Sequence, residues 1–144
     1  MSKFIINYGS QYIDSDDIRA VSNVLKSDWL TQGPQIEKFE NNLKTYFNAK
    51  FCTVLSSGTA ALHLAALALG WKKDDVIITT SMTFLATSNC ILYCGATPVF
   101  ADIEDKYYTI DVDKLEQKIK FFEKKKKRIT GIIATDYAGH PCDW

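Results

Sequence analysis

Two amphipathic helices are predicted in the first fifty residues. Apolar side chains recur every three or four positions there, the spacing of one helix face: Ile18, Val21, Val24 and Leu25, then Ile36, Phe39, Leu43 and Phe47. Residues 14–17, Asp-Ser-Asp-Asp, are typical of a helix cap with an acidic first turn. Pro34 suits the first turn of the second helix. We expect each helix to bury one stripe and to keep the other face in water.

From residue 51 onward, short apolar runs alternate with helical segments. The pattern predicts strands at 51–55, 76–80, 98–101 and 129–135, and helices at 60–69, 85–94 and 112–122. This alternation predicts an α/β fold, in which a mostly parallel sheet carries helices on both faces. The helix at 60–69 is apolar on nearly every side, so we expect it to be covered on all sides.

The carboxyl ends of the predicted strands are the expected place for a ligand. Parallel sheets bind ligands outside these ends. The segments that follow the strands therefore share one rim, namely residues 57–60, 81–84, 102 and 136–140.

The composition mainly excludes classes of partner and of binding site. The chain has 144 residues, enough for one modest domain with a core. Seventeen basic and seventeen acidic residues cancel, so bulk charge indicates neither nucleic acid nor an anionic membrane as a partner. The N-terminal residues hold no apolar run of signal-peptide length. We therefore expect a cytoplasmic protein with four reduced cysteines. With only two histidines, we expect no metal site.

The residues best suited to bind a ligand lie in the turn between the apolar run 51–55 and the helix that follows. A helix start leaves several backbone N–H groups without partners, and the helix dipole adds positive charge there. Gly58 permits close approach of a ligand to the backbone, while Ser56, Ser57 and Thr59 offer hydroxyl groups. This turn is therefore a candidate phosphate site. An ordinary strand-to-helix turn is the alternative, because the segment matches neither the P-loop nor G-x-G-x-x-G.

Six segments, in order along nearly the whole chain, resemble one family. They are Ile6-Asn-Tyr-Gly-Ser-Gln11, Trp29-Leu-Thr-Gln-Gly-Pro34, Ser56-Ser-Gly-Thr-Ala-Ala-Leu62, Met82-Thr-Phe-Leu-Ala-Thr-Ser-Asn89, Ala96-Thr-Pro-Val-Phe-Ala-Asp102 and Ala138-Gly-His-Pro-Cys-Asp143. The chain thereby resembles the DegT/DnrJ/EryC1/StrS sugar aminotransferases, which are fold-type-I pyridoxal-phosphate enzymes. It is most similar to the nucleotide-sugar 4-aminotransferases that make amino sugars for bacterial glycans, including those of the pseudaminic acid pathway.

The resemblance implies a set of cofactor-binding residues. Ser57, Gly58, Thr59 and Ala60 would hold the phosphate of pyridoxal 5'-phosphate, in agreement with the candidate turn. Phe84 would stack on the pyridine ring. A core aromatic side chain at a helix start is the alternative for Phe84.

The resemblance also implies substrate-binding residues. Tyr8, Gln11 and Gln32 fall in segments that line the nucleotide-sugar side of the family's site, although polar loop residues commonly just face water. His63 is interpreted as a packed core histidine. His140 lies at the rim, but nothing pairs it with a nucleophile, and no catalytic residue is assigned.

By resemblance, an amino donor, which is glutamate in most of the family, converts the cofactor to its amino form, and that form then aminates a 4-keto group on a nucleotide-linked deoxysugar. By resemblance, the lysine that forms the Schiff base and the acidic residue that faces the pyridine nitrogen come after residues 139–141, beyond the 144 residues. We therefore expect an N-terminal part of an aminotransferase, with a helical segment at 1–50, the first part of the cofactor-binding large domain at 51–144 and no small domain. We expect this part alone not to turn over, and the family to act as a homodimer.

Alternatives from other functional classes stay open. The chain could be a truncated, non-catalytic remnant, or a weak ligand-binding module that uses only the phosphate turn. It could also serve another fold-type-I reaction, such as sugar dehydration or desulfuration. Part of a sheet leaves an unpaired edge and uncovered apolar helices, so we expect the isolated piece to misfold or associate.

Overall fold

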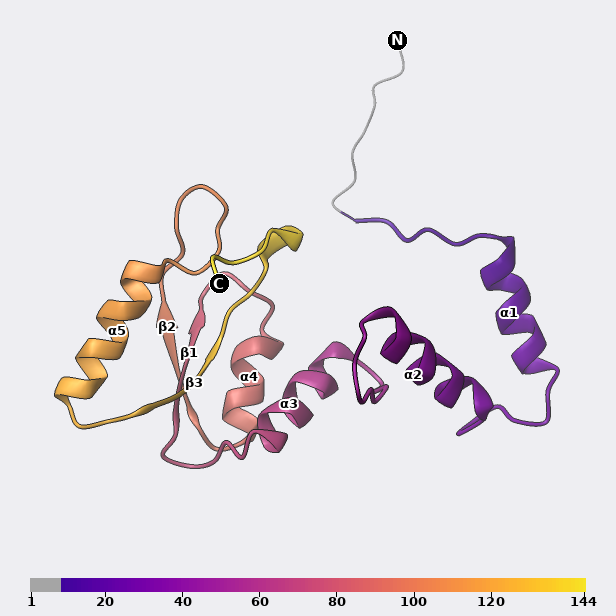
Figure 1. Cartoon of the computed structure of the whole chain (residues 1–144), viewed down its shortest axis with the longest axis horizontal. Coiled ribbons are helices and arrows are strands. Elements are labelled where there is room, and N and C mark those ends of the chain that lie inside the picture. Colours follow the sequence, from indigo (N-terminus) through magenta and orange to yellow (C-terminus); the bar gives the residue numbers. More distant parts are fainter. Residues whose placement is uncertain (1–8) are drawn as a thin grey trace, which may run out of the picture. The chain divides into compact units, whose positions relative to one another are not determined.

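The computed structural model describes residues 9–144. They divide into two compact units, one that ends at Val54 and one that runs from Leu55 to Trp144. Each unit is described by itself (Figure 1). None of the helices in the described residues is long and apolar enough to cross a membrane.

The first unit consists of the two predicted helices, α1 (Ser15–Leu25) and α2 (Pro34–Tyr46). Asp14 caps α1 by accepting hydrogen bonds from the N–H groups of Asp16 (2.8 Å) and Asp17 (3.1 Å). The Asp17 carboxylate in turn accepts from the Asp14 N–H at 3.0 Å, which completes a capping box. Most apolar side chains on the predicted buried faces of α1 and α2 are about half exposed or more. The expected burial of these faces therefore does not occur within this unit.

The strand predicted at residues 51–55 is wrong. This segment has no regular secondary structure, and no described strand pairs with it. The Val54 N–H donates instead to the side chain of Glu40 in α2, at 2.9 Å. An apolar run becomes a strand only where a neighbouring strand takes its backbone hydrogen bonds, and none does so here.

The second unit holds a three-stranded parallel sheet in the order β2-β1-β3. Its strands are β1 (Val76–Thr80), β2 (Thr97–Ala101) and β3 (Ile129–Ile133). Its helices are α3 (Gly58–Ala68), α4 (Ala86–Tyr93) and α5 (Val112–Lys124), followed by the short 3-10 turn Tyr137–Gly139. The predicted α/β fold with a parallel sheet is thereby confirmed.

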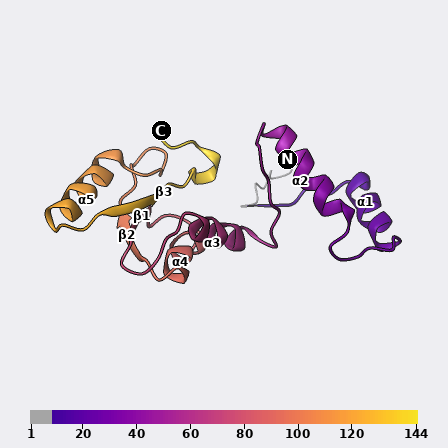
Figure 2. The ribbon, with the colours of Figure 1, turned by 60° about the horizontal axis from the view of Figure 1, so that its bottom comes forward.

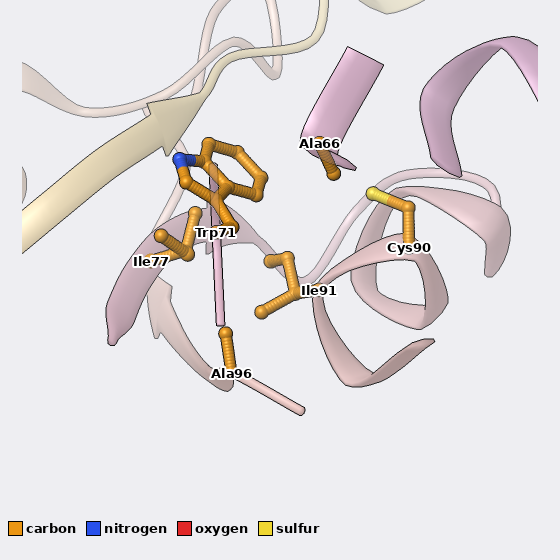
Figure 3. Close-up of a cluster of buried hydrophobic side chains, with 6 residues drawn as sticks. All are labelled: Ala66, Trp71, Ile77, Cys90, Ile91 and Ala96. Carbon is orange, nitrogen blue, oxygen red and sulfur yellow. The ribbon is translucent and has the colours of Figure 1, made fainter. Parts of the chain in front are cut away.

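Helices cover both faces of this sheet (Figures 1 and 2). On one face, α3 and α4 enclose a cluster of buried side chains, which point toward one another in Figure 3: Ala66, Trp71, Ile77, Cys90, Ile91 and Ala96. On the other face, α5 covers a second cluster that includes Ile78, Ala101 and Ile110. Ile77 and Ile78 serve opposite clusters because successive side chains of a strand point to opposite faces.

Helix α3 is not covered on all sides, which corrects the expectation from its composition. It packs against α4, and Ala66 is its one fully buried residue. Leu64, Leu67 and Leu69 are about half exposed or more. Within this unit only one side of α3 has a neighbouring helix, so its remaining apolar sides face outward.

Candidate functional site

The turn at the start of α3 leaves backbone donors free. Ser57 is the N-cap residue, and its Oγ accepts a hydrogen bond from the Ala60 N–H at 3.2 Å. The Ser57 carbonyl accepts from the Ala61 N–H at 3.0 Å. Within residues 9–144, the N–H groups of Gly58 and Thr59 have no acceptor. Two donors at the positive end of the helix dipole are therefore available to an anion.

Gly58 leaves the space beside this turn open. A Cβ built at Gly58 would meet no atom within 4 Å, and the residue does not have a left-handed φ. Neither crowding nor backbone conformation within the chain therefore requires glycine at this position. The open backbone and the two free donors fit the phosphate group of a cofactor.

Phe84 is strongly exposed. It lies between β1 and α4, and 76% of the residue is accessible. The alternative that Phe84 is a core aromatic residue is therefore wrong. An aromatic ring with a free face can stack on a flat, conjugated ligand.

The carboxyl ends of the strands lie at one edge of the sheet, because all three strands are parallel. Ser81 follows β1, and Asp102 follows β2. The hydroxyl of Thr83, after β1, lies 2.9 Å from the hydroxyl of Thr135, after β3. Segments that are 52 residues apart in the sequence thus meet at the predicted rim.

The residues expected on the substrate side belong to the first unit. Tyr8 lies outside the described residues. Gln11 is exposed ahead of α1. Gln32 is exposed after α1, has a left-handed φ of 51° and lines a hollow of about 460 Å³ with Trp29 and Glu37. Their role in substrate binding stays a prediction.

The two histidines make aromatic contacts. His63 is half-buried and packs edge-on against Tyr93, with ring centroids 5.2 Å apart. His140 is exposed and stacks on Tyr107, with centroids 4.0 Å apart and the planes within 14°. The sequence did not indicate the partner of His140, because Tyr107 lies on a different loop.

The buried cysteines do not offer a nucleophile. Burial raises the pKa of the Cys90 thiol, and the nearby Cys94 raises it further. Burial also raises the pKa of Cys142, as does its hydrogen bond with Asp136. Both thiols are therefore protonated at neutral pH, and a thiol is a much weaker nucleophile than a thiolate.

Comparisons with known proteins agree with this geometry. The sequence profile of the DegT/DnrJ/EryC1/StrS aminotransferase family matches residues 11–144. A Campylobacter jejuni protein, UDP-4-amino-4,6-dideoxy-N-acetyl-beta-L-altrosamine transaminase, is 40% identical over 136 residues, which are 94% of this chain and 35% of that protein.

Solved structures of aminotransferases are also similar to this chain. Helicobacter pylori PseC, an aminotransferase involved in the biosynthesis of pseudoaminic acid, superimposes with a TM-score of 0.81 at 35% identity, over 95% of this chain and 36% of that chain. Spr1654 from Streptococcus pneumoniae, solved in a PLP form, superimposes with a TM-score of 0.83 at 33% identity, over 97% of this chain and 34% of that chain.

The chain spans about a third of the length of the curated relatives that it matches. The described fold, the turn at the start of α3 and the exposed Phe84 all lie within the matched region. The sequence profile covers most of the chain, and solved relatives share its fold. The chain therefore belongs to the DegT/DnrJ/EryC1/StrS aminotransferase family.

Proposed function

We propose that this chain supplies the first part of the cofactor-binding large domain of a sugar aminotransferase that uses pyridoxal 5'-phosphate. The observation that carries the proposal is the turn at the start of α3, with two free N–H donors and an open glycine. Family membership and the PLP form of a solved relative support the same cofactor. When bound, pyridoxal phosphate supplies an electron sink for moving an amino group.

Each residue of the proposed site has a distinct task. The N–H groups of Gly58 and Thr59 hold the phosphate, and the Ser57 side chain keeps the turn in shape by capping α3. The exposed ring of Phe84 stacks on the pyridine ring and thereby orients it.

The proposed substrate is a nucleotide-linked 4-keto deoxysugar, with glutamate as the amino donor. This assignment rests on the relatives, one of which is named as a transaminase of a UDP-linked amino sugar and another as an enzyme of pseudoaminic acid biosynthesis. Tyr8, Gln11 and Gln32 are the proposed substrate-side residues. A homodimeric assembly and a cytoplasmic location are part of the same proposal.

A direct test titrates the protein with pyridoxal phosphate and follows cofactor absorbance and tryptophan quenching. Gly58→Ala is the informative variant, because its Cβ meets nothing in the protein and alanine is a better helix former than glycine. We expect its melting temperature to equal or exceed that of the wild type. We expect its affinity for pyridoxal phosphate to fall about fivefold or more, because the added Cβ occupies the space through which the phosphate reaches the backbone N–H groups and so weakens a hydrogen bond of about 1 kcal/mol.

Gly9→Ala is a matched control, because a Cβ at Gly9 also meets no atom within 4 Å. It should bind pyridoxal phosphate like the wild type. Pyridoxal without the phosphate should bind much more weakly than the phosphorylated form. Equal binding of the two compounds, or wild-type affinity in Gly58→Ala, would contradict the proposed phosphate site.

A further inference from the structure

Among the side-chain hydrogen bonds that the loop carrying Phe84 makes within residues 9–144, the one that reaches the segment after β3 is made by Thr83. Among residues 81–85, Ser81, Met82, Phe84 and Leu85 are exposed, and Thr83 is half-buried. A residue that is 76% exposed receives little orientation from packing. The position of Phe84 therefore depends on how the backbone beside it is held.

Thr83 is held from two sides. Its Oγ1 lies 2.9 Å from Oγ1 of Thr87 and 2.9 Å from Oγ1 of Thr135. Because a hydroxyl group donates one hydrogen bond and accepts others, Thr83 can make both contacts at once. Thr87 is buried in the first turn of α4, and its N–H donates to the Phe84 carbonyl at 3.0 Å.

The third hydroxyl group belongs to Thr135 and connects the loop to the segment after β3, which is distant in the sequence. Thr135 follows β3 and is half-buried, and its carbonyl accepts a hydrogen bond from the Cys142 thiol at 3.3 Å. The three hydroxyl groups thus connect the loop after β1 to the first turn of α4 and to the segment after β3. Half-buried hydroxyl pairs at 2.9 Å are stronger restraints than exposed ones, since water competes less for them.

We propose that Thr83 is a positioning residue, which fixes the ring of Phe84 for the cofactor through the hydroxyl chain Thr87–Thr83–Thr135. This inference rests on the proposed function, because Phe84 is assigned there as the residue that stacks on pyridoxal phosphate. Thr83 itself touches no reacting atom in this assignment.

Thr83→Val is the first variant to test. Valine keeps the β-branched shape of threonine and removes the hydroxyl group, so both contacts are lost with little change in volume. Thr83→Ser keeps the hydroxyl group and should restore them. Thr97→Val is the matched control, because Thr97 is exposed at the start of β2 and its hydroxyl makes no hydrogen bond within residues 9–144.

Two measurements on the whole protein separate positioning from general stability. Without cofactor, amide hydrogen exchange of Thr87 and Asn89, whose N–H groups donate to the carbonyls of Phe84 and Leu85, should accelerate about fivefold in Thr83→Val, the factor for one hydrogen bond of about 1 kcal/mol, while β1 keeps its protection. With pyridoxal phosphate, the circular dichroism that the bound chromophore acquires should shrink, and its Kd should rise by a similar factor. Thr83→Ser and Thr97→Val should behave like the wild type.

Wild-type exchange, dichroism and Kd in Thr83→Val would overturn the inference. If Thr83→Val does not fold, Thr135→Val can replace it, because it removes only the contact between Thr83 and Thr135. We expect the same changes in exchange, dichroism and Kd for Thr135→Val, but smaller ones. If the wild type binds no pyridoxal phosphate, the proposed function fails. The exchange comparison without cofactor still decides whether the hydroxyl chain fixes the loop.

Discussion

At the scale of single residues, Gly131 shows how the fold constrains a position from across the molecule. It lies in the middle of β3, beside the indole of Trp71. A Cβ at this position would lie 2.5 Å from Cζ2 of Trp71 and 3.0 Å from Cε2. Trp71 is buried in the cluster between α3, α4 and the sheet, so the ring has little room to move away.

We predict that Gly131→Ala destabilises the protein by about 1–3 kcal/mol, the usual cost of an added methyl group in a packed core. Urea unfolding followed by circular dichroism measures the change. In a Trp71→Phe background, the smaller ring should reduce the penalty of Gly131→Ala. An alanine variant as stable as the wild type would show that the contact with Trp71 is looser than described.

Residues of the candidate site differ in how far the sequence predicts them. Ser57, Gly58 and Thr59 were predicted because a helix start is a local feature, with cap, glycine and free donors adjacent in sequence. The contact between Thr83 and Thr135 could not be predicted, because it joins residues 52 positions apart.

At the scale of elements, the loop between β2 and α5 is organised around one carboxylate. Glu104 accepts hydrogen bonds from the N–H groups of Lys106 (2.7 Å), Tyr107 (2.7 Å) and Thr109 (3.2 Å). Desolvation alone would raise the pKa of Glu104, but these hydrogen bonds to the charged form outweigh it, so the pKa is lowered.

The lowered pKa predicts how this loop responds to acid. A carboxyl group whose pKa is lower in the folded state than in the unfolded state stabilises the folded state at neutral pH. This holds at pH values above the pKa of the unfolded group, which is about 4.3. That contribution is lost as the pH falls through the folded pKa. Glu104→Gln should therefore be less stable than the wild type at pH 7, and the difference should shrink on acidification below about pH 4. Thermal melts across this pH range test it, and a constant difference would contradict the role of the charge.

Elements with local signals formed where they were predicted. Asp14 caps α1 as predicted. Asp111, directly before the helix predicted at 112–122, caps α5 in the same way by accepting from the Lys114 N–H at 2.9 Å. The strands β1, β2 and β3 agree with the apolar runs to within about two residues. The run at 51–55 is also largely apolar but forms no strand, because a strand needs a partner and a helix does not.

At the scale of the whole molecule, the chain passes from the first unit to the second through a segment without regular structure. Residues 49–56 contain neither helix nor strand, and Phe51 is 80% exposed. The division between the units falls after Val54. Such segments open locally at little cost in free energy and are preferred sites of proteolysis.

We predict that limited digestion with chymotrypsin cuts at Phe51 before it cuts at Phe84 in the second unit. Phe84 is also exposed in a loop, but the contacts of Thr83 and the start of α4 hold that loop, so its cleavage should be slower. Mass spectrometry of the early fragments identifies the cut. Phe51→Ser should remove the early product. A cut at Phe84 that precedes the cut at Phe51 would contradict this order of local stability.

The sequence by itself determined the helices with their caps, the parallel α/β class, the turn at the start of α3 that we propose as a phosphate site and, by resemblance, the aminotransferase family. These features depend on residues close together in the chain, or on motifs in a fixed order. The tertiary structure alone decided that residues 51–55 form no strand, that α3 keeps apolar sides exposed, and that Phe84 faces outward. It alone brought Gly131 against Trp71 and Thr83 against Thr135. These outcomes depend on which distant segments meet, because backbone pairing and side-chain burial are completed only by neighbours from elsewhere in the chain.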